Sequence, residues 1–402
     1  MRKTSLIKAT LLLAAIAFLP YAASGQKTAA PTANATASAS PPSGVTFETK
    51  TIPNVGPQPF AIAADDVNKD GVLDLLVTDP SALLLLTLIG KPDGTFSITG
   101  FSPAGQLPRG LALADLNRDG SLDAVVASSQ SDAISVLLAD GKGSFAPRKE
   151  YKAGERPFAI AIGDINEDGH ADVVVANESN VSVTGPGKVS VFFGDGTGAL
   201  NPQKDIDAGR FPSDVQMADF NGDKHLDLVV INWGTQEALI FLGNGKGEFQ
   251  KGESVPTEGP AYSVQVADMN GDGHLDIVTC NIGAPRGRVM LGDGKGHFTN
   301  GPGMRTGTGC RSVAVADLNG DGRLDVAAAN TNIATVQVSL ADGEGTYTDS
   351  LTFPVGQLPR WVTATDINKD GRPDLLVADM GSKSVTLLIN TTPFPAKTKP
   401  RK

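Results

Sequence analysis

The feature that most constrains the fold of this chain is a nonapeptide that occurs seven times. It reads Asp-x-Asn-x-Asp-Gly-x-x-Asp with one exception at its sixth position, and successive copies begin 49 residues apart, except for one interval of 55: Asp66, Asp115, Asp164, Asp219, Asp268, Asp317 and Asp366. A fixed period of this length indicates a repeat architecture, in which each unit is one supersecondary motif packed against its neighbours. The longer interval marks an insertion at residues 181–188 in the third unit.

Each unit predicts four β-strands. An apolar run such as residues 158–162 precedes the nonapeptide and a β-rich run such as residues 172–175 follows it, which predicts a hairpin. A third apolar run, such as residues 189–193, leads to a Gly-rich turn that ends in an aromatic residue in most units, and an exposed outer strand follows. Four strands are the content of one blade of a β-propeller.

The two ends of the repeat region distinguish a closed ring from an open solenoid. The seventh unit stops after its third strand at Asn390, and a matching outer strand stands at the front of the region. Phe47 lies 13 residues before Phe60, just as Phe145 lies 13 residues before Phe158. Closure protects the sheet edges, whereas a solenoid needs capping repeats. We therefore expect an all-β, seven-bladed β-propeller over residues 44–390, closed by its N-terminal strand.

The segments outside the repeats predict export. Residues 1–24 combine a basic start, an apolar run and small residues, which is typical of a signal peptide, and the run is too short for a transmembrane anchor. Residues 25–43 are rich in Ala, Thr, Ser and Pro and predict a disordered linker. Residues 391–402 form a basic, Pro-rich tail that we expect to be disordered too. We expect a secreted monomer, located outside the cell or in the periplasm or cell envelope.

The nonapeptide has the composition of a calcium loop. Its positions 1, 3, 5 and 9 bring three carboxylates and one amide oxygen onto nine residues, and a hard cation such as Ca²⁺, which prefers six to eight oxygen ligands, relieves their repulsion. We expect up to seven Ca²⁺ ions. The predicted ligands, in chain order, are Asp66, Asn68, Asp70, Asp74, Asp115, Asn117, Asp119, Asp123, Asp164, Asn166, Asp168, Asp172, Asp219, Asn221, Asp223, Asp227, Asp268, Asn270, Asp272, Asp276, Asp317, Asn319, Asp321, Asp325, Asp366, Asn368, Asp370 and Asp374.

Two other interpretations of the nonapeptide are an EF-hand calcium loop and a set of Asx-turns. An EF-hand is excluded because position 12 carries Val, Thr or Ala where that motif needs a bidentate Glu. Asx-turns that merely cap hairpins remain the other interpretation, which seven complete ligand sets make the weaker one. Position 6 is Gly in six copies and permits the positive φ that the loop needs. Lys224 replaces it in the fourth copy, so we expect that site to be strained and weakest.

The nonapeptides and the Phe-Gly or Leu-Gly turns at residues 193–196 and 291–294 resemble the FG-GAP/VCBS repeat. This repeat builds the propellers of integrin α-subunits and of many bacterial secreted proteins, and the resemblance covers residues 44–390. It implies a seven-bladed propeller whose calcium loops join the first and second strands on the lower face. It also implies that ligands meet the opposite, upper face, as in cell adhesion or protein interaction.

The residues favour a binding module over an enzyme. A net charge of −10 argues against nucleic acid as a partner. Three of the four His residues, His170, His225 and His274, occupy position 7 of their loops, and we do not expect positions repeated around a ring to converge on one site. No Ser-His-Asp set, HExxH motif or phosphate loop is present. The alternative is a lyase-type enzyme acting on polysaccharide through upper-face Arg and Tyr residues.

The upper-face loops carry the residues expected to bind a ligand. Aromatic and Arg side chains on rigidly held loops are common interface anchors, and this mixture suits an anionic glycan or an acidic protein segment. The predicted ligand-binding residues are Trp233, Trp361, Tyr262, Arg109 and Arg360, with Arg156, Arg210, Arg286 and Arg311 nearby. The competing interpretation is that the aromatic residues plug the rim of the central channel while the Arg residues are solvated or paired.

The two cysteines of the chain lie in neighbouring units. Cys280 ends the second strand of the fifth unit and Cys310 precedes the first strand of the sixth. An even number of cysteines in a secreted chain is compatible with a disulfide. Alternatively, Cys280 fills a small core position that is Ala in other units. The sequence leaves both open.

Overall fold

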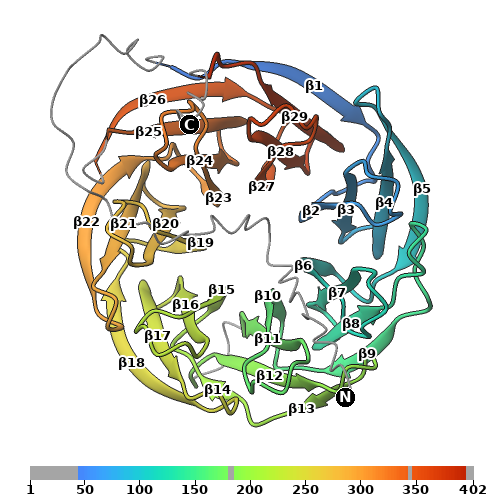
Figure 1. Cartoon of the computed structure of the whole chain (residues 1–402), viewed down its shortest axis with the longest axis vertical. Coiled ribbons are helices and arrows are strands. Elements are labelled where there is room, and N and C mark those ends of the chain that lie inside the picture. Colours follow the sequence, from blue (N-terminus) through green and yellow to red (C-terminus); the bar gives the residue numbers. More distant parts are fainter. Residues whose placement is uncertain (1–43, 180–184, 343–345, 395–402) are drawn as a thin grey trace, which may run out of the picture.

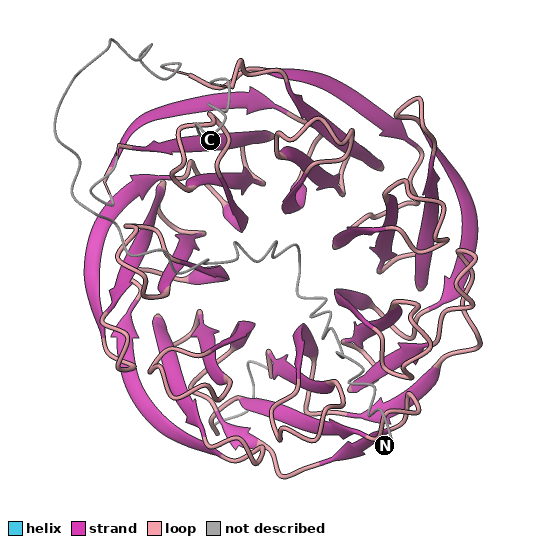
Figure 2. Ribbon diagram, in the orientation of Figure 1, coloured by secondary structure: helices cyan, strands magenta, loops and turns pink. Residues whose placement is uncertain are grey.

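The computed structural model describes residues 44–179, 185–342 and 346–394, which form a ring of seven antiparallel sheets around a central axis (Figure 1). The described residues form strands and turns and contain no helix (Figure 2). The predicted signal peptide and linker, and part of the insertion in the third unit, lie outside the described residues. The predicted all-β, seven-bladed propeller is confirmed.

Six blades take their strands in sequence order from the axis outward, and the seventh takes β27, β28 and β29 and then β1 as its outermost strand. Blade 1 contains β2 (Ile62–Asp65), β3 (Asp74–Asp79), β4 (Leu84–Gly90) and β5 (Phe96–Pro103). Blade 2 contains β6 (Pro108–Ala114), β7 (Asp123–Ser128), β8 (Ala133–Leu137) and β9 (Lys149–Lys152). Blade 3 contains β10 (Pro157–Gly163), β11 (Asp172–Asn177), β12 (Lys188–Gly194), β13 (Leu200–Pro202) and β14 (Ile206–Asp207). Blades 4 and 5 contain β15 (Pro212–Ala218), β16 (Asp227–Asn232), β17 (Glu237–Gly243), β18 (Phe249–Pro256); and β19 (Ala261–Ala267), β20 (Asp276–Asn281), β21 (Arg286–Gly292), β22 (Phe298–Arg305). Blades 6 and 7 contain β23 (Cys310–Ala316), β24 (Asp325–Asn330), β25 (Thr335–Ala341), β26 (Tyr347–Pro354); and β27 (Pro359–Thr365), β28 (Asp374–Asp379), β29 (Ser384–Asn390), β1 (Phe47–Pro53).

The ring closes where β1 pairs antiparallel with β29, from Phe47 opposite Asn390 to Pro53 opposite Ser384. The closure extends beyond the expected end of the propeller. The Thr391 amide donates to the Thr46 carbonyl oxygen at 2.9 Å, and the buried Thr392 hydroxyl accepts from the Thr46 amide at 3.0 Å. The first two residues of the predicted tail therefore belong to the ring, because they continue the strand pairing that joins its ends.

Two outer strands are shorter than the repeat predicts. In blade 2 only β9 and an isolated bridge from Ala139 to Phe145 represent the expected strand, and in blade 3 that strand is divided into β13 and β14. Both segments carry a proline two residues after the turn, Pro147 and Pro202. Proline has no N–H for the strand ladder, which accounts for both interruptions.

The hydrophobic core is a ring of layers between blades. Each of the seven clusters of buried apolar residues joins two neighbouring blades, as where Val174 of β11 and Val230 of β16 share one cluster. The second strand of every blade is buried along its whole length. Burial on both sides explains why these strands are mainly apolar between their polar end residues. The scaffold therefore holds the inner strands in fixed positions around the axis.

Candidate functional site

The nonapeptides form the turns between the first and second strands of all seven blades, and we call the side of the ring that carries them the loop face. In blade 1 the Asp66 carboxylate accepts from the amides of Asp70 at 3.0 Å and Gly71 at 2.7 Å. The Asn68 side-chain oxygen also accepts from the Asp70 amide, at 2.8 Å, and the Asp70 carboxylate accepts from the Val72 amide at 2.7 Å. Positions 1, 3 and 5 therefore turn their oxygens toward the same short stretch of backbone.

These tight loops need two residues with positive φ. Position 6 has φ of 86° at Gly71 and comparable values in the other loops, and Lys224 adopts 76° although it is not glycine. Position 4 is left-handed as well, and in four blades it is not glycine: Lys69, Arg118, Glu167 and Lys369. Left-handed backbone costs a residue with a Cβ about 1–2 kcal/mol. The strain predicted at Lys224 is therefore present in its backbone.

The aspartate at position 9 has a role in the fold. Each of the seven is 0% exposed. In blade 3, Asp172 accepts from the amide of Ile165 at 3.0 Å and from the amide of Gly194 at 2.8 Å, and the other six copies repeat this pair of contacts. Burial raises the pKa of most of these carboxyls to about 6, and that of Asp325 to about 7. Position 9 therefore ties the loop to the end of the third strand.

The predicted calcium ligands fit a cation in part. Positions 1, 3 and 5 supply the oxygen donors that Ca²⁺ prefers. Within the described part of the chain, however, no group of three or more His, Cys, Asp or Glu side chains is arranged to hold a metal ion. At position 9 both carboxylate oxygens accept backbone hydrogen bonds, so each keeps one lone pair for a cation.

Some neighbouring loops contact each other through position 4. Lys369 donates to the Gly71 carbonyl oxygen of the next blade, and Arg118 donates to that of Gly169. Glu167 lies 2.5 Å from Nδ1 of His225, and this hydrogen bond raises the pKa of His225. The loop face is thus linked from blade to blade by exposed side chains.

The other end of the inner strands forms a pocket of about 260 Å³ at the mouth of the central channel. We call this side of the ring, which corresponds to the predicted upper face, the pocket face. Counting back six residues from the first Asp of each nonapeptide gives one residue per blade, and all seven line the pocket: Phe60, Arg109, Phe158, Ser213, Tyr262, Arg311 and Arg360. The remaining lining residues are Arg156, Glu178, Asp214 and Trp361. The repeat thus places seven side chains of four residue types at equivalent positions around the axis.

Glu178 contacts three polar side chains on one side of the pocket. Its buried carboxylate lies 3.2 Å from Arg109 and 3.0 Å from Arg156, and it accepts from the Tyr262 hydroxyl at 2.9 Å. Burial lowers the pKa of Arg109, although Glu178 opposes the shift. Burial, reinforced by Glu178, raises the pKa of Tyr262.

Arg311 and Arg360 occupy the other side of the pocket. The Arg311 guanidinium carbon lies 4.3 Å from the Tyr262 ring centroid, and that of Arg360 lies 6.0 Å from the centroid of Phe60. The Nε atoms of both are buried without a hydrogen-bond partner. Among the described residues neither side chain forms an ion pair, in contrast to Arg109. Burial, and next the charge of Arg311, lower the pKa of Arg360 to about 10.

The remaining predicted ligand residues divide between the pocket and its surroundings. Trp361 lines the pocket and packs against two core clusters. Trp233 lies behind the pocket, stacked on Tyr262 at 6.2 Å and on Phe211 at 4.8 Å. Arg210 lies over Phe211, outside the pocket lining. Arg286 is exposed and lines a separate hollow of about 350 Å³ that also includes residues of the outer strands β22 and β26.

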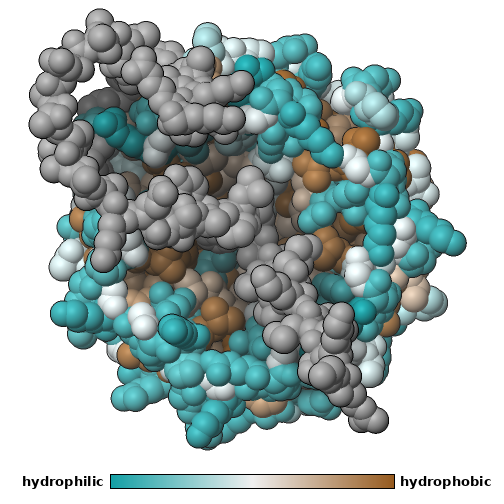
Figure 3. Space-filling model, viewed as in Figure 1, coloured by the Kyte–Doolittle hydropathy of each residue, from teal (hydrophilic) through white to brown (hydrophobic). Residues whose placement is uncertain are grey.

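Sequence reasoning missed Phe60, Phe158, Ser213, Asp214 and Glu178. The first three were detectable, because the same six-residue count that reaches Arg109 and Tyr262 reaches them too. Glu178 follows the second strand of blade 3, where no repeated position marks it. Figure 3 shows patches of hydrophobic residues toward the inner part of the ring on the viewed face, whereas the outer margin is mainly hydrophilic.

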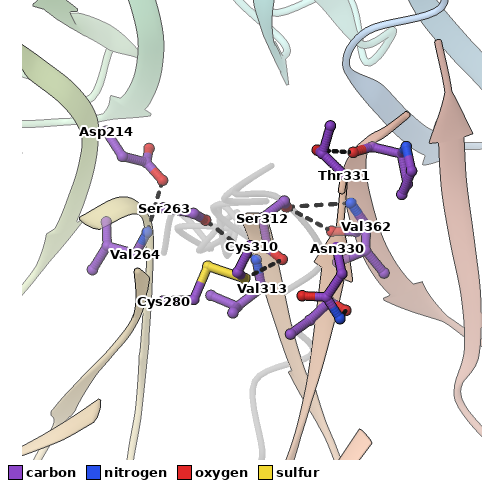
Figure 4. The surroundings of a disulfide bond; sticks show 12 residues. Asp214, Ser263, Val264, Cys280, Cys310, Ser312, Val313, Asn330, Thr331 and Val362 are labelled. Atoms are coloured by element: carbon purple, nitrogen blue, oxygen red, sulfur yellow. Dashed lines mark hydrogen bonds between the residues drawn. A yellow bond between two sulfur atoms is a disulfide. The ribbon is translucent and has the colours of Figure 1, made fainter. Parts of the chain in front are cut away.

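Cys280 and Cys310 form a disulfide that joins blades 5 and 6, with their Cα atoms 5.9 Å apart (Figure 4). The bond lies beside a second set of contacts between inner strands. Five residues before each nonapeptide, Asp214, Ser263 and Ser312 accept from the amides of Val264, Val313 and Val362 in the next blade, at 2.8, 3.4 and 3.2 Å. Burial raises the pKa of Asp214 to about 7, although backbone hydrogen bonds oppose the shift.

Comparison with solved structures shows the same fold in other proteins. Two crystal structures of BBS1N in complex with ARL6DN, soaked with lead and with mercury, have TM-scores of 0.59 and 0.60. Each is 12% identical over 88% of this chain and 98% of the other. A protein from Bacteroides uniformis that is provisionally assigned as a 6-phosphogluconolactonase has a TM-score of 0.53, with 12% identity over 73% of this chain and 82% of its own. At such identities the likeness shows the fold alone.

Comparison with sequence families identifies one family, whereas comparison with curated proteins identifies none. No curated protein matches the chain. The model of the FG-GAP-like repeat matches six times, at residues 66–126, 115–175, 180–230, 219–279, 281–328 and 317–377. The described residues contain no helix that is long and apolar enough to cross a membrane. From the six matches and the ring of four-stranded blades, the chain belongs to the FG-GAP-like repeat family of β-propellers.

Proposed function

We propose that this chain is a secreted, calcium-binding propeller that acts as a protein-interaction module through its pocket face. One observation carries the proposal: seven side chains of four residue types converge at the mouth of the channel, while the other end of the same strands repeats one motif. Uniform loops suit a scaffold, and a varied, rigidly held rim suits recognition. A propeller of similar fold was crystallised with a protein partner, which agrees with this role.

Calcium has a supporting role in this proposal. Side-chain oxygens of positions 1, 3 and 5 would hold the ion in each loop, and the position-9 carboxylate would contribute its remaining lone pairs. Bound Ca²⁺ would neutralise the carboxylates that crowd the loop face. The ion would thereby stabilise the loops, which contain most of the left-handed residues of the inner hairpins.

Secretion is supported by two features. The signal-peptide pattern of residues 1–24 is one of them. The disulfide between blades 5 and 6 is the other, since disulfides persist mainly in oxidising compartments.

The geometry of the pocket favours binding over catalysis. A lyase would need a base, and Tyr262 is the side chain that an Arg-Tyr lyase site would use. Its hydroxyl donates to Glu178 and its pKa is raised, which is the opposite of an activated base. We therefore propose that the chain is not an enzyme. Incubation with polygalacturonate should produce no new unsaturated ends, and their appearance would contradict this part of the proposal.

The interaction role is tested by affinity capture with matched variants. The immobilised chain is compared with Trp233→Ala/Trp361→Ala and Arg109→Ala/Arg360→Ala on the pocket face, and with Lys246→Ala/Lys295→Ala, which alters exposed turns of the loop face. Quantitative mass spectrometry of proteins retained from an envelope extract of the producing organism is the measurement. We expect a set of proteins that both pocket-face variants lose and the loop-face variant keeps. Equal retention by all four chains would refute the assignment.

A further inference from the structure

The pocket has a surplus of positive charge in a chain that is acidic overall. Its lining contains four guanidinium groups and two carboxyl groups: Arg109, Arg156, Arg311, Arg360, Glu178 and Asp214. Glu178 is shared by Arg109 and Arg156. Asp214 accepts from the Val215 and Val264 amides. Arg311 and Arg360 are therefore left without an anionic partner among the described residues, although the whole chain carries a net charge of −10.

The unpaired guanidinium groups are held in place by aromatic rings. Cation–π contact with Tyr262 and Phe60 covers guanidinium faces, and the buried Nε donors have no partner. An unpaired buried donor is costly, so a ligand that accepts from it gains binding energy. The planar guanidinium fork matches a carboxylate, which accepts two parallel N–H bonds. The lowered pKa of Arg360, to about 10, agrees with a group that lacks a counter-charge.

The size of the pocket limits what carries the carboxylate. At about 260 Å³ it lies below the range of roughly 300–1,000 Å³ that is typical of small-molecule sites. One side chain or one chain terminus fills such a space. The apolar lining by Phe60, Phe158 and Trp361 suits the short methylene stem of an acidic residue.

We propose that the Arg311 and Arg360 side of the pocket binds a carboxylate of a protein partner, supplied by an Asp or Glu side chain or by a carboxy terminus. The inference rests on the proposed function as an interaction module and names the group that the module recognises.

Intrinsic fluorescence offers a direct measurement, because the two Trp residues of the chain line the pocket or lie next to it. The probes are three pools of acetylated hexapeptides: one with a central Asp or Glu and an amidated end, one with Asn or Gln and an amidated end, and one with Asn or Gln and a free carboxy terminus. We expect saturable fluorescence changes with the acidic pool, the free-terminus pool or both, and none with the neutral amidated pool. The two carboxylate pools distinguish a side chain from a terminus.

Variants link the signal to the two arginines. Arg311→Gln and Arg360→Gln should each weaken binding at least tenfold, and Arg360→Lys, which keeps the charge but loses the fork, should weaken it less. The matched control is Arg286→Gln, an exposed arginine outside the pocket, which should bind like the unaltered chain. The Gln variants remove like-charge repulsion, so we expect them to fold, as their melting curves will show.

Several outcomes would overturn the proposal. Equal binding of the neutral amidated pool, or equal affinity of Arg311→Gln and Arg286→Gln, excludes carboxylate recognition at this site. Absence of any signal with the carboxylate pools at millimolar concentration does so too. Tighter binding of trigalacturonate than of the peptides would reassign the pocket to anionic glycans, and tighter binding of inorganic phosphate would reassign it to phosphate groups. If the capture experiment still finds proteins retained through the pocket face, the interaction role stands and only the carboxylate inference fails.

Discussion

The two faces of the ring use the same seven inner strands in opposite ways. At the end where the strands enter the nonapeptides, every blade presents almost the same residues in the same hydrogen bonds. At the other end, the equivalent position carries Phe, Arg, Ser or Tyr, and the side chains meet around one pocket. Repetition at one end supplies a rigid frame, and variation at the other supplies a specific surface. Substitutions on the loop face should therefore change stability, and those on the pocket face should change binding.

Removal of Ca²⁺ tests this comparison with the largest expected effect. A ligand that binds only the folded state at about 100 times its dissociation constant stabilises by about 2.7 kcal/mol per site. With several loops involved, excess chelator should lower the melting temperature by several degrees or more, as followed by differential scanning calorimetry. Added Mg²⁺ should restore little, because it keeps several waters and demands stricter geometry. An unchanged melting curve would remove calcium from the loop face.

Substitutions within one loop separate the fold-stabilising role of position 9 from the proposed metal-binding role of position 5. In chelator, Asp172→Ala should destabilise by about 2–6 kcal/mol, because two buried amides lose their acceptor at about 1–3 kcal/mol each. Asp168→Ala, at the exposed position 5 of the same loop, should cost far less in chelator and lose its stabilisation by Ca²⁺. Urea unfolding of both variants with and without Ca²⁺ measures the difference. Equal effects in chelator would contradict the separate roles.

A buried aspartate in the pocket lining, Asp214, predicts that the stability of the chain depends on pH. The pKa of Asp214 is about 7 in the folded chain and 3.8 as the ordinary value, so the folded state holds the proton more tightly. Its contribution to stability is greatest below pH 4 and is lost as the pH rises toward 7, by up to about 4 kcal/mol. Asp214→Ser copies the residues that stand at this position in blades 5 and 6, Ser263 and Ser312, whose hydroxyls accept the equivalent amide.

The serine variant should be more stable than the unaltered chain at pH 8 and should show a flatter profile between pH 4 and 7. Urea unfolding across this range is the measurement, and Ser263→Ala serves as the control that alters an equivalent contact without an acid. A variant profile that retains the full slope would assign the dependence to other groups, such as the position-9 carboxyls.

The sequence was sufficient to predict the ring, its closure and the loops, because each depends on periodic spacing alone. It was not sufficient to assign position 9, because an Asp that binds a metal and an Asp that accepts two amides have the same spacing. The expectation that repeated positions do not converge concerned the His residues of the loops, and it does not extend to the innermost residues of the strands. Phe60 belongs to blade 1 and Arg311 to blade 6, far apart in sequence, yet both line the same pocket near the axis. The positive φ at Lys69 and at its equivalents in blades 2, 3 and 7 was likewise missed, since position 4 is glycine only in blades 4, 5 and 6.

The smallest expected effect comes from position 6 of the loops in blades 4 and 5, which differ there by Lys224 and Gly273 and share glycine at position 4. Both residues have positive φ, 76° and 87°, and no atom lies within 4 Å of a Cβ placed on Gly273. Backbone strain is therefore the main difference, and steric contact is absent. In chelator, Lys224→Gly should stabilise the chain and Gly273→Ala should destabilise it, each by about 1 kcal/mol. Calcium titration should show tighter binding at blade 4 in the first variant and weaker binding at blade 5 in the second. The proposed ion binds the curled loop, and a residue with a Cβ at position 6 makes that backbone conformation more costly. Shifts of the same sign in both variants would mean that the side chain of Lys224, and not its backbone, sets the behaviour of this loop.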